Sequence, residues 1–280
     1  MRFQLLGSAA GKPVPRTFCR CRVCLHAMKQ GGPDLRTRTG MNLFLDGDNF
    51  PEPKYRIDLP PDTGHHMMVH RFNMNLLEHL LFTHYHEDHF DLLYLTHRGR
   101  AMSDRAEMPW LNIYGSAETG VRFDSRNLDL EDLRLRYHQV EPFQTFSVGE
   151  LEVFSLKGNH APGTLHYVIR HAGKSVLQAW DTGWYEDETW EAFEDLKLDA
   201  VFMECTQFGG PEAIRANSHC NFHTLRMMRE RLLDMNVIQC DTPYITVHMG
   251  DNGLLLHSER VELAEPHNIT VGYDGLELEV

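Results

Sequence analysis

The sequence lacks a hydrophobic run long enough to cross a membrane, and it is poor in positive charge. No stretch of its 280 residues approaches the ~20 consecutive apolar residues that a membrane span needs. The apolar run at residues 1–6 is too short for a secretory signal peptide, so we expect a cytoplasmic protein without membrane association. Lys and Arg number 27 against 40 Asp and Glu, a net charge of -13. Because nonspecific nucleic-acid binding draws its affinity from Lys and Arg, we expect no nucleic-acid partner.

Internal repeats, low-complexity tracts and linker-like segments are also absent from the sequence. The length alone allows one large or two small domains, and 42% hydrophobic residues can bury a sizeable core. Since both halves of the chain supply predicted strands and candidate ligands, we predict one domain over residues 1–280. Six Cys without an export signal indicate thiols or metal ligands rather than disulfides.

The densest chemical signal is the run His-Tyr-His-Glu-Asp-His at residues 84–89. The apolar residues 80–83 before it are typical of a buried strand, and the leucines after it suit a short helix. The first two histidines leave the strand on the same side, whereas Asp88 and His89 turn the corner and can face a second ion. Imidazole and carboxylate are the donors that a borderline divalent cation prefers. A structural loop has no need for this order of residues, so the pattern favours a metal site over a merely polar loop.

This H-x-H-x-D-H pattern is the signature of the metallo-β-lactamase superfamily, which the chain resembles along nearly its whole length. The family places three further ligands in order at strand ends, and the chain matches them with His160, Asp181 and His248. The resemblance therefore implies two divalent metal ions in the active site. The ligands that it implies for the first ion are His84, His86 and His160. Those for the second ion are Asp88, His89 and His248, with Asp181 bridging the two ions.

The same resemblance implies the fold class, α/β (α+β): an αββα sandwich of two mixed β-sheets flanked by helices. Turn signals predict hairpins at residues 165–180 and 269–280, and apolar spacing predicts a long helix from Phe222. Asp58 ends a predicted strand, where it could orient a ligand His or cap a turn. We interpret the histidines of residues 65–70 as solvated members of a polar loop.

Three of the cysteines form the pattern C-x-C-x-x-C at residues 19–24 and can close on one tetrahedral zinc if a fourth ligand arrives from elsewhere. The alternative is three reduced thiols in a loop. With the small-residue loop at 7–11, this cluster resembles one subfamily, the cyclic phosphodiesterases that accompany the carbon–phosphorus lyase of phosphonate breakdown. That subfamily implies a structural zinc whose fourth ligand is a His, but this chain has Asp251 at that position, and His257 is the other candidate. The candidate structural zinc ligands are Cys19, Cys21, Cys24 and Asp251. We expect the other cysteines to be buried apolar residues: Cys205, Cys220 and Cys240.

The segment at residues 217–220, Asn-Ser-His-Cys, resembles an Asn-His-Cys stretch of the same subfamily, in which the His serves as general acid. His219 is therefore our candidate proton donor, and the alternative is an incidental His near a helix start. The dipole at a helix N-terminus disfavours a protonated His, so we expect acid catalysis to need a nearby phosphate that holds the proton. The candidate catalytic residues are His219, Asp88 and Asp181.

These motifs predict a metal-dependent hydrolase in which two ions ~3.5–4 Å apart hold a bridging hydroxide that attacks phosphorus. The expected substrate is a small phosphodiester of the cyclic ribose-phosphate or nucleotide type, as the phosphonate-metabolism resemblance implies. The ligand types leave zinc, manganese and iron open as the metal. The sequence is also compatible with a homodimer.

Three other functions stay open beside this prediction. A tRNA 3′-processing endonuclease is the closest mechanistic rival, but it usually carries a Lys-rich arm that this chain lacks. A glyoxalase II-type thioesterase shares the full ligand set. A non-catalytic cofactor-biosynthesis relative shares the first loop and the Cys cluster, but it typically lacks the intact metal motif.

Overall fold

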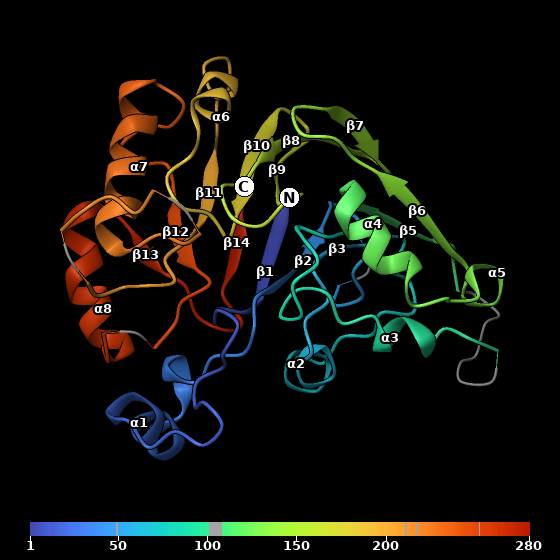
Figure 1. The fold of residues 1–280 in the computed structure, drawn as a ribbon, viewed down its shortest axis with the longest axis horizontal. Coiled ribbons are helices and arrows are strands. Elements are labelled where there is room, and N and C mark those ends of the chain that lie inside the picture. The colour runs from blue at the N-terminus through green and yellow to red at the C-terminus, as the bar shows by residue number, and fades with distance from the viewer. Residues whose placement is uncertain (49, 101–107, 211, 217, 252) are drawn as a thin grey trace.

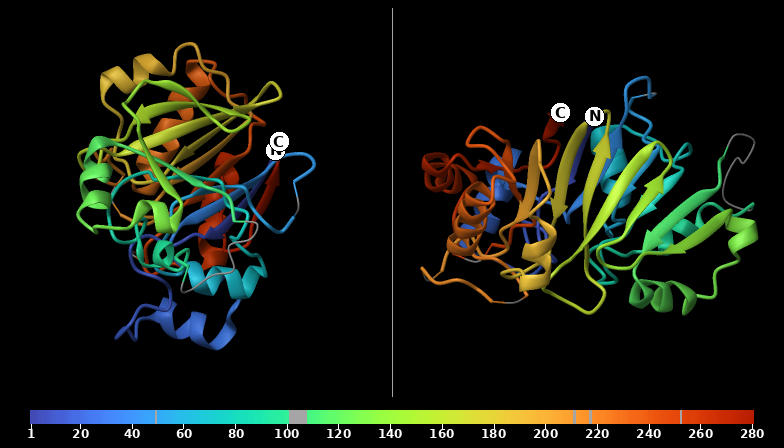
Figure 2. Two further views of the ribbon diagram at one scale, coloured as in Figure 1. Left: turned by 90° about the vertical axis from the view of Figure 1, so that its right-hand side faces the viewer. Right: turned by 90° about the horizontal axis from the view of Figure 1, so that it is seen from above.

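Two facing β-sheets form the centre of the molecule. The computed structural model describes residues 1–280 except 49, 101–107, 211, 217 and 252. The strands of the described residues form two sheets of seven strands each. Figure 1 and Figure 2 show these sheets between two groups of helices. The predicted fold class, an αββα sandwich of two mixed β-sheets, is confirmed.

The first sheet contains both chain ends. Its strands, in spatial order, are β14 (Glu277–Glu279), β1 (Arg2–Gly7), β2 (Gly40–Phe44), β3 (Tyr55–Ile57), β4 (His79–Leu81), β5 (Leu111–Gly115) and β6 (Leu135–Gln139). Strands β14 to β3 pair antiparallel, whereas β3 to β6 run parallel. Met1 and Val280 exchange backbone hydrogen bonds of 2.9 Å, so the two termini lie side by side (Figure 1).

The second sheet has the same mixed character. Its strands, in spatial order, are β13 (Thr270–Val271), β12 (Tyr244–Val247), β11 (Ala200–Glu204), β10 (Lys174–Ala179), β9 (Leu165–His171), β8 (Leu151–Lys157) and β7 (Thr145–Val148). Strands β10 to β13 run parallel, and β7 to β10 pair antiparallel. The predicted hairpin at 165–180 is confirmed as β9 and β10.

Helices cover the outer face of each sheet. On the second sheet lie α6 (Asp187–Ala192), α7 (Phe222–Asp234) and α8 (His257–Ala264). On the first sheet lie α3 (Leu93–Thr96), α4 (Ala117–Asp124) and α5 (Leu130–Leu133). Two more helices are α2 (Thr63–His70) and α1 (Arg22–Gln30), and α1 lies apart from both sheets (Figure 1). Short 3-10 turns occupy Gly32–Asp34 and Glu265–His267. Within the described residues, no helix has the length and apolar character that crossing a membrane requires.

Side-chain alternation along the strands explains these layers. In β11, Ala200 and Phe202 pack in the core between the sheets, whereas Val201 and Met203 pack toward α6 and α7. This follows because successive side chains of a strand point to opposite faces of the sheet. Strand β11 is thus buried on both faces, as its unbroken apolar sequence indicates.

The strand ends of both sheets meet at one rim. Strands β10, β11 and β12 run parallel, so their C-terminal ends share one edge. Asp181 follows β10, Glu204 ends β11, and His248 follows β12. The metal motif follows β4 of the other sheet, and the Leu165 N–H donates to the Thr83 carbonyl across the gap at 2.8 Å. Residues distant in sequence are therefore delivered to one place.

The prediction of a hairpin at 269–280 is wrong. Strand β13 pairs with β12 in the second sheet, whereas β14 pairs with β1 in the first. The turn between them is fixed by Asp274, whose carboxylate accepts the backbone N–H of Ser8 at 2.8 Å and of Thr37 at 2.7 Å. These long-range contacts direct the chain away from β13, so the local turn signal did not decide the pairing.

The interpretation of residues 65–70 as a polar loop is also wrong, because they lie in α2. His66 is only 1% exposed, and its Nε2 lies 2.7 Å from Thr37 Oγ1. A hydroxyl partner from a distant segment allows this polar ring to be buried.

All six cysteines are free, as predicted. Cys205 and Cys220 are buried, also as predicted, but Cys240 is exposed. Cys240 follows α7 in a turn in which the Gln239 N–H donates to Thr242 Oγ1.

Candidate metal centre

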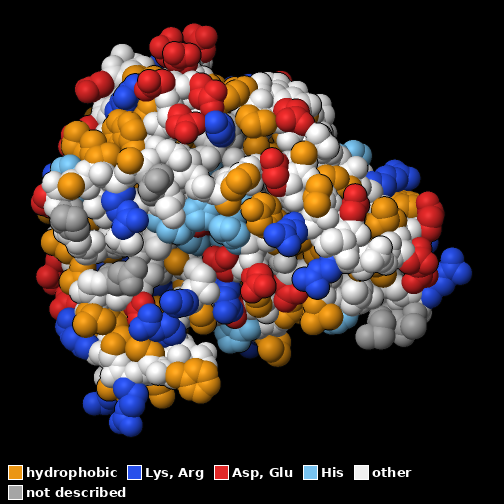
Figure 3. All heavy atoms as spheres, viewed as in Figure 1, with side chains coloured by type: hydrophobic (Ala, Val, Ile, Leu, Met, Phe, Trp, Pro, Cys, Tyr) orange, Lys and Arg blue, Asp and Glu red, His pale blue; other side chains and the backbone are white. Residues whose placement is uncertain are grey.

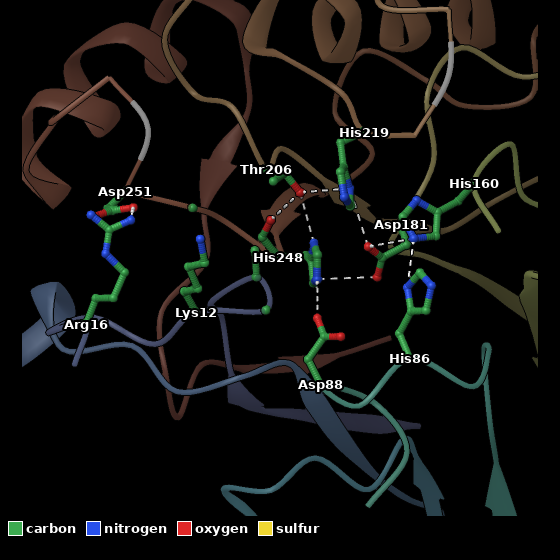
Figure 4. Close-up of a pocket in the computed structure, with 13 residues that line it drawn as sticks. Lys12, Arg16, His86, Asp88, His160, Asp181, Thr206, His219, His248 and Asp251 are labelled. Carbon is green, nitrogen blue, oxygen red and sulfur yellow. Dashed lines mark hydrogen bonds and ion pairs between the residues drawn. The ribbon is translucent and has the colours of Figure 1, made fainter. Parts of the chain in front are cut away.

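The predicted metal ligands converge at the rim where the two sheets meet. The donor atoms of the first predicted group lie within 4.8 Å of one another, and those of the second group do too. The first group is His84, His86 and His160. The second group is Asp88, His89 and His248. Figure 4 shows five of the predicted ligands pointing toward one another from different segments.

Asp181 lies between the two groups, where a bridging carboxylate is predicted. Its Oδ2 lies 2.8 Å from His89 Nε2 and 3.3 Å from His248 Nε2. Its Oδ1 lies 3.9 Å from His160 Nε2, and the carboxylate is 2% exposed. One carboxylate thus faces histidines of both groups with different oxygens.

Four of the histidines are oriented by hydrogen-bonding partners behind them. In each ring Nδ1 has the partner, which leaves Nε2 for the centre of the site. The contacts are Thr83 Oγ1 to His84 (3.1 Å), Asp58 Oδ2 to His89 (2.8 Å), the Ser218 carbonyl to His160 (2.7 Å) and Thr206 Oγ1 to His248 (2.9 Å).

Asp58 is the most connected of these partners. Besides His89, its carboxylate accepts the Thr83 N–H at 2.8 Å, the Thr83 hydroxyl at 2.9 Å and Trp180 Nε1 at 2.7 Å. The residue is fully buried. Of the two roles considered from the sequence, the geometry therefore favours orientation of a ligand His over a turn cap.

Four buried atoms at the centre test whether these residues fit a metal. They are His84 Nε2, His89 Nε2, His248 Nε2 and Asp181 Oδ2, and none makes a well-formed hydrogen bond within the described residues, although His89 Nε2 and Asp181 Oδ2 lie 2.8 Å apart. A buried polar atom without a partner costs about 1–3 kcal/mol, so several of them close together need another kind of partner. Imidazole and carboxylate donors in two neighbouring groups, with Asp181 between them, fit two divalent cations.

The charges of the site favour cations as well. Burial lowers the pKa of His84 well below its usual range, so this ring is neutral, as a metal ligand must be. Burial raises the pKa of Asp181, but His248 and His89 outweigh it and lower the pKa well below its usual range. Burial also lowers the pKa of His89, but Asp88, Asp181 and Asp58 outweigh it and raise the pKa well above its usual range. These carboxylates therefore make the buried centre strongly attractive to positive charge.

The backbone is strained at several of these positions. Asp58, Asp181 and His248 have φ angles of 58°, 67° and 51°, in the left-handed region that residues other than Gly rarely adopt. The first loop passes close beneath the site, since a Cβ on Gly11 would lie 3.1 Å from Asp88 Oδ2. Gly11 therefore leaves room for the Asp88 carboxylate, which a larger side chain would crowd.

A cavity of ≈ 400 Å³ opens above these residues. Figure 3 shows it as a hollow in which histidines gather, with Lys or Arg side chains on both sides. In Figure 4, Lys12 and Arg16 lie on one side of the cavity and His86 and His160 on the other. Sequence reasoning did not single out either cation, because nothing in the local sequence of the first loop predicts where its side chains point.

His219 lines the cavity beside the Asp181 carboxylate, a position that suits a catalytic role. Its Nδ1 lies 3.0 Å from Glu204 Oε1 and 3.3 Å from Asp181 Oδ1. Glu204 is fully buried and also accepts the backbone N–H of Thr182 and of Thr206, at 2.6 and 2.9 Å. Burial lowers the pKa of His219, but Glu204 outweighs it and raises the pKa to about 9.

We expected a nearby phosphate to keep His219 protonated. In the structure the Glu204 carboxylate has this role. Sequence reasoning missed Glu204 and Thr206. Glu204 ends the apolar strand β11, and a carboxylate closing a buried strand was the available signal. His219 also lies within 4.8 Å of His160 and Asp181, so its neighbours allow a ligand role too. Asn217, the first residue of the motif, lies outside the described residues.

The cysteine cluster forms a second candidate metal site. The three thiols at positions 19, 21 and 24 and the Asp251 carboxylate lie within 4.8 Å of one another. His257 is not part of this cluster, and its Nδ1 lies 3.4 Å from Arg36 instead. Hydrogen bonds from the Cys21 N–H and from Arg16 lower the pKa of Cys19 to about 7, which favours the thiolate that zinc binds. Three thiols and a carboxylate in this arrangement fit a tetrahedral ion.

One family model matches most of the chain. Residues 59–254 match the model of the β-lactamase superfamily domain. No curated protein matches the chain.

Several solved structures have a similar fold over the whole chain. A new diphosphatase from the PhnP family is 20% identical, with 100% of this chain and 98% of that one covered and a TM-score of 0.76. Zinc-bound PqqB from Methylobacterium extorquens is 18% identical, with 100% of both chains covered and a TM-score of 0.72. Human tRNase Z, short form, is 15% identical, with coverage of 100% and 99% and a TM-score of 0.66. At these identities the similarity shows the fold alone.

Proposed function

Because the chain belongs to the β-lactamase superfamily, whose members are mostly metal-dependent hydrolases, we propose that it is a dinuclear-metal-dependent phosphodiesterase of small substrates. The observation that carries the proposal is the pair of donor groups that flank Asp181 beneath one cavity. The cavity volume of ≈ 400 Å³ and the cations Lys12 and Arg16 on its wall suit a small anionic ester.

The seven predicted ligands would hold the two ions. When bound, such ions supply Lewis-acid stabilisation of phosphoryl oxygens and lower the pKa of a water. The protein's part is to fix the ligands before the reaction, which the contacts behind four of the histidines support. Asp88 and Asp181 contribute the negative charge that attracts the ions.

His219 is the proposed proton donor to the leaving oxygen. Its Nδ1 is engaged by Glu204 and Thr206, whereas its Nε2 makes no hydrogen bond within the described residues. A raised pKa keeps the ring protonated at neutral pH, so Nε2 carries a proton that it can donate. Glu204 keeps its hydrogen bond with Nδ1 and orients the ring. Glu204 is itself held by the backbone N–H groups of Thr182 and Thr206, so the carboxylate that orients the acid is fixed in place.

The test is metal analysis combined with a substrate panel. The panel contains bis-p-nitrophenyl phosphate, cyclic ribose phosphates, cyclic nucleotides, a thioester and a lactone. We expect about two ions per chain beyond the cysteine cluster and preferential hydrolysis of a phosphodiester. The matched control is His65→Ala, which removes an exposed histidine outside the site and leaves the rates unchanged. Preference for the thioester over every phosphate would refute the proposal in favour of a glyoxalase II-type thioesterase.

The similar structures define two further additions to the panel. One relative is described as a diphosphatase, so a dinucleoside diphosphate is included to ask whether a P–O–P bond is preferred. Another is tRNase Z, so a tRNA precursor is included as well. Faster cleavage of the tRNA precursor than of every small ester would contradict the proposed substrate size. No turnover of any compound by metal-loaded protein would favour a non-catalytic role.

A further inference from the structure

A second cavity lies beside the cavity of the metal centre. Its volume is ≈ 400 Å³, and Tyr85, Phe90, Arg122 and Arg126 are among its lining residues. We call it the α4 cavity, because α4 forms one of its walls. His86, a candidate metal ligand, lines both cavities. A substrate whose phosphate lies at the metal centre therefore has room to extend past His86 into the α4 cavity.

The walls of the α4 cavity combine aromatic rings with positive charge. Tyr85 lies within the metal motif and is partly buried, and Phe90, directly after the motif, is buried. Arg122 lies in α4 and Arg126 just after its end, so the two are neighbours on one side of the helix. Among the described lining residues are these two cations and one carboxylate, Glu87. Figure 3 shows Lys or Arg side chains on the α4 side of the histidine hollow.

The Arg122 guanidinium lies over the Tyr85 ring, with its central carbon 5.2 Å from the ring centre. The Tyr85 ring in turn contacts His86 edge to face, with ring centres 5.5 Å apart. No third ring fits between Arg122 and Tyr85, because rings that stack directly are already about 4.5–7 Å apart. Arg122 is exposed and forms no ion pair within the described residues. The guanidinium face that points away from Tyr85 is therefore the one available to a ligand.

This surface suits a planar ring better than a lone phosphate. Guanidinium groups attract aromatic rings through stacking and cation–π contacts. Nucleobases stack on guanidinium planes as well as on aromatic side chains. A phosphate would interact with the charge of Arg122 but would gain nothing from Tyr85 or Phe90. The aromatic walls therefore favour a nucleobase as the ligand.

We propose that the α4 cavity is a nucleobase subsite, in which the base stacks on Arg122 and Tyr85 supports Arg122 from the opposite face. The inference rests on the proposed function and narrows it: the substrate is a nucleoside cyclic phosphate rather than a base-free ribose phosphate. In such a substrate the ribose connects the phosphate at the metal centre to the base beyond His86. Arg122 is in this sense a specificity residue, and Tyr85 is its positioning residue.

The test compares ligands with and without a base. The substrates are adenosine 2′,3′-cyclic phosphate and methyl β-D-ribofuranoside 2′,3′-cyclic phosphate, in which a methoxy group replaces adenine. Their KM and kcat values are measured with the metal-loaded enzyme. The Kd values of the corresponding 3′-phosphomonoesters are measured by calorimetry with the same enzyme, which requires no turnover of a diester. In the wild type we expect adenine to lower both KM and Kd about tenfold, as base stacking does in single-stranded nucleic-acid binding.

The variants change the stacking surface one part at a time. Arg122→Ala should remove the preference for the base, and Arg122→Lys should lose most of it, since Lys keeps the charge but has no flat face. Tyr85→Leu should lower the preference about threefold, whereas Tyr85→Phe should keep it, because the support comes from the ring and not the hydroxyl. Tyr85 lies between two candidate ligands, so metal content is measured in both of its variants and only metal-loaded protein is compared.

Arg126→Ala is the matched control. It removes an exposed cation from the same cavity, but this cation does not lie over the Tyr85 ring, so the preference for the base should stay at about tenfold. Equal losses in Arg126→Ala and Arg122→Ala would indicate attraction by charge alone and overturn the stacking. Equal binding of both ligands by the wild type, or an unchanged preference in Arg122→Ala, would overturn the subsite. If neither cyclic phosphate is hydrolysed but the Kd preference depends on Arg122 as stated, only the proposed function fails.

Discussion

The two candidate metal sites of this protein are built in different ways. The His/Asp site lies at the junction of two sheets, and Asp58, Thr83, Thr206 and the Ser218 carbonyl support its histidines from behind. The cysteine site lies just before α1 and at its start, with Asp251 supplied by the segment after β12. Its main polar support is a partly exposed arginine, Arg16.

The histidines of the first site are held in place by buried partners, whereas the second site has fewer such contacts. Ligands fixed by buried hydrogen bonds keep their geometry during a reaction, which catalysis requires. The cysteine ligands lie in a loop and at a helix start, and their arginine partner is 34% exposed, so fewer buried contacts hold them. We therefore expect changes at the first site to affect the chemical step and changes at the second to affect stability.

The largest expected effect follows from loss of the shared carboxylate. Asp181→Ala or His86→Ala should abolish turnover and lower the metal content of the His/Asp site. The loss should be about three orders of magnitude or more, since metal ions contribute several kcal/mol to such reactions. Rates on bis-p-nitrophenyl phosphate and metal analysis measure both effects. Full activity in either variant would contradict the assignment of this centre.

The second prediction concerns the hydrogen-bonding partners that orient the candidate ligand histidines. Asp58→Asn should weaken metal binding about 10- to 100-fold, because His89 loses its orienting charge. It should also lower stability by about 3–5 kcal/mol, since buried partners of the carboxylate are left unpaired. Metal titration and denaturant unfolding measure these changes. Asp124→Asn, at an exposed position, is the control that should change neither. If both variants had the same metal affinity and stability, Asp58 would not be what orients His89.

The third prediction separates acid catalysis from metal binding. His219→Ala should slow turnover at least about tenfold, or 1.4 kcal/mol, and leave the metals bound. His223→Ala, which loses a contact with exposed Glu212, is the control. Loss of an ion in His219→Ala would instead identify the residue as a ligand.

The fourth prediction concerns pH. His219 must be protonated to donate, so activity should fall as the pH rises through its raised pKa. Glu204→Gln removes the charge that raises this pKa, so the alkaline limb should move to lower pH. The amide of Gln keeps only one of the two oxygens that accept the backbone N–H groups of Thr182 and Thr206, so one of these groups loses its partner and stability should fall by about 1–3 kcal/mol. A pH–rate profile below the melting temperature checks the shift. An unmoved limb would show that another group sets it.

The smallest effect on chemistry is expected at the second site. Cys21→Ala should lower the zinc content by one equivalent and stability by about 1–3 kcal/mol, with kcat unchanged. Cys240→Ala, at an exposed cysteine outside the cluster, should change neither quantity. Full zinc retention in Cys21→Ala would show that the thiols do not bind the metal.

The sequence predicted which residues converge at the rim, because the segments that carry them follow strands whose ends meet there. It could not predict Glu204 or Arg16. Glu204 acts on His219 from a neighbouring strand, and Arg16 acts on Asp251 across 235 positions. Such contacts depend on the three-dimensional path of the chain and not on local spacing.

The wrong predictions have the same physical origin. Residues 269–280 carry a hairpin signal, yet Asp274 binds the backbone at Ser8 and Thr37 and sends the last strand to the other sheet. His66 looked solvated, yet a distant Thr37 hydroxyl allows its burial. In each case a tertiary hydrogen bond outweighed the local pattern.

Anomalous X-ray scattering from crystals grown with zinc tests the central claim most directly. We predict two peaks ~3.5–4 Å apart on either side of the Asp181 carboxylate, and a third among the cysteines. A single peak at the rim, or none between Asp88, His89 and His248, would contradict a dinuclear centre.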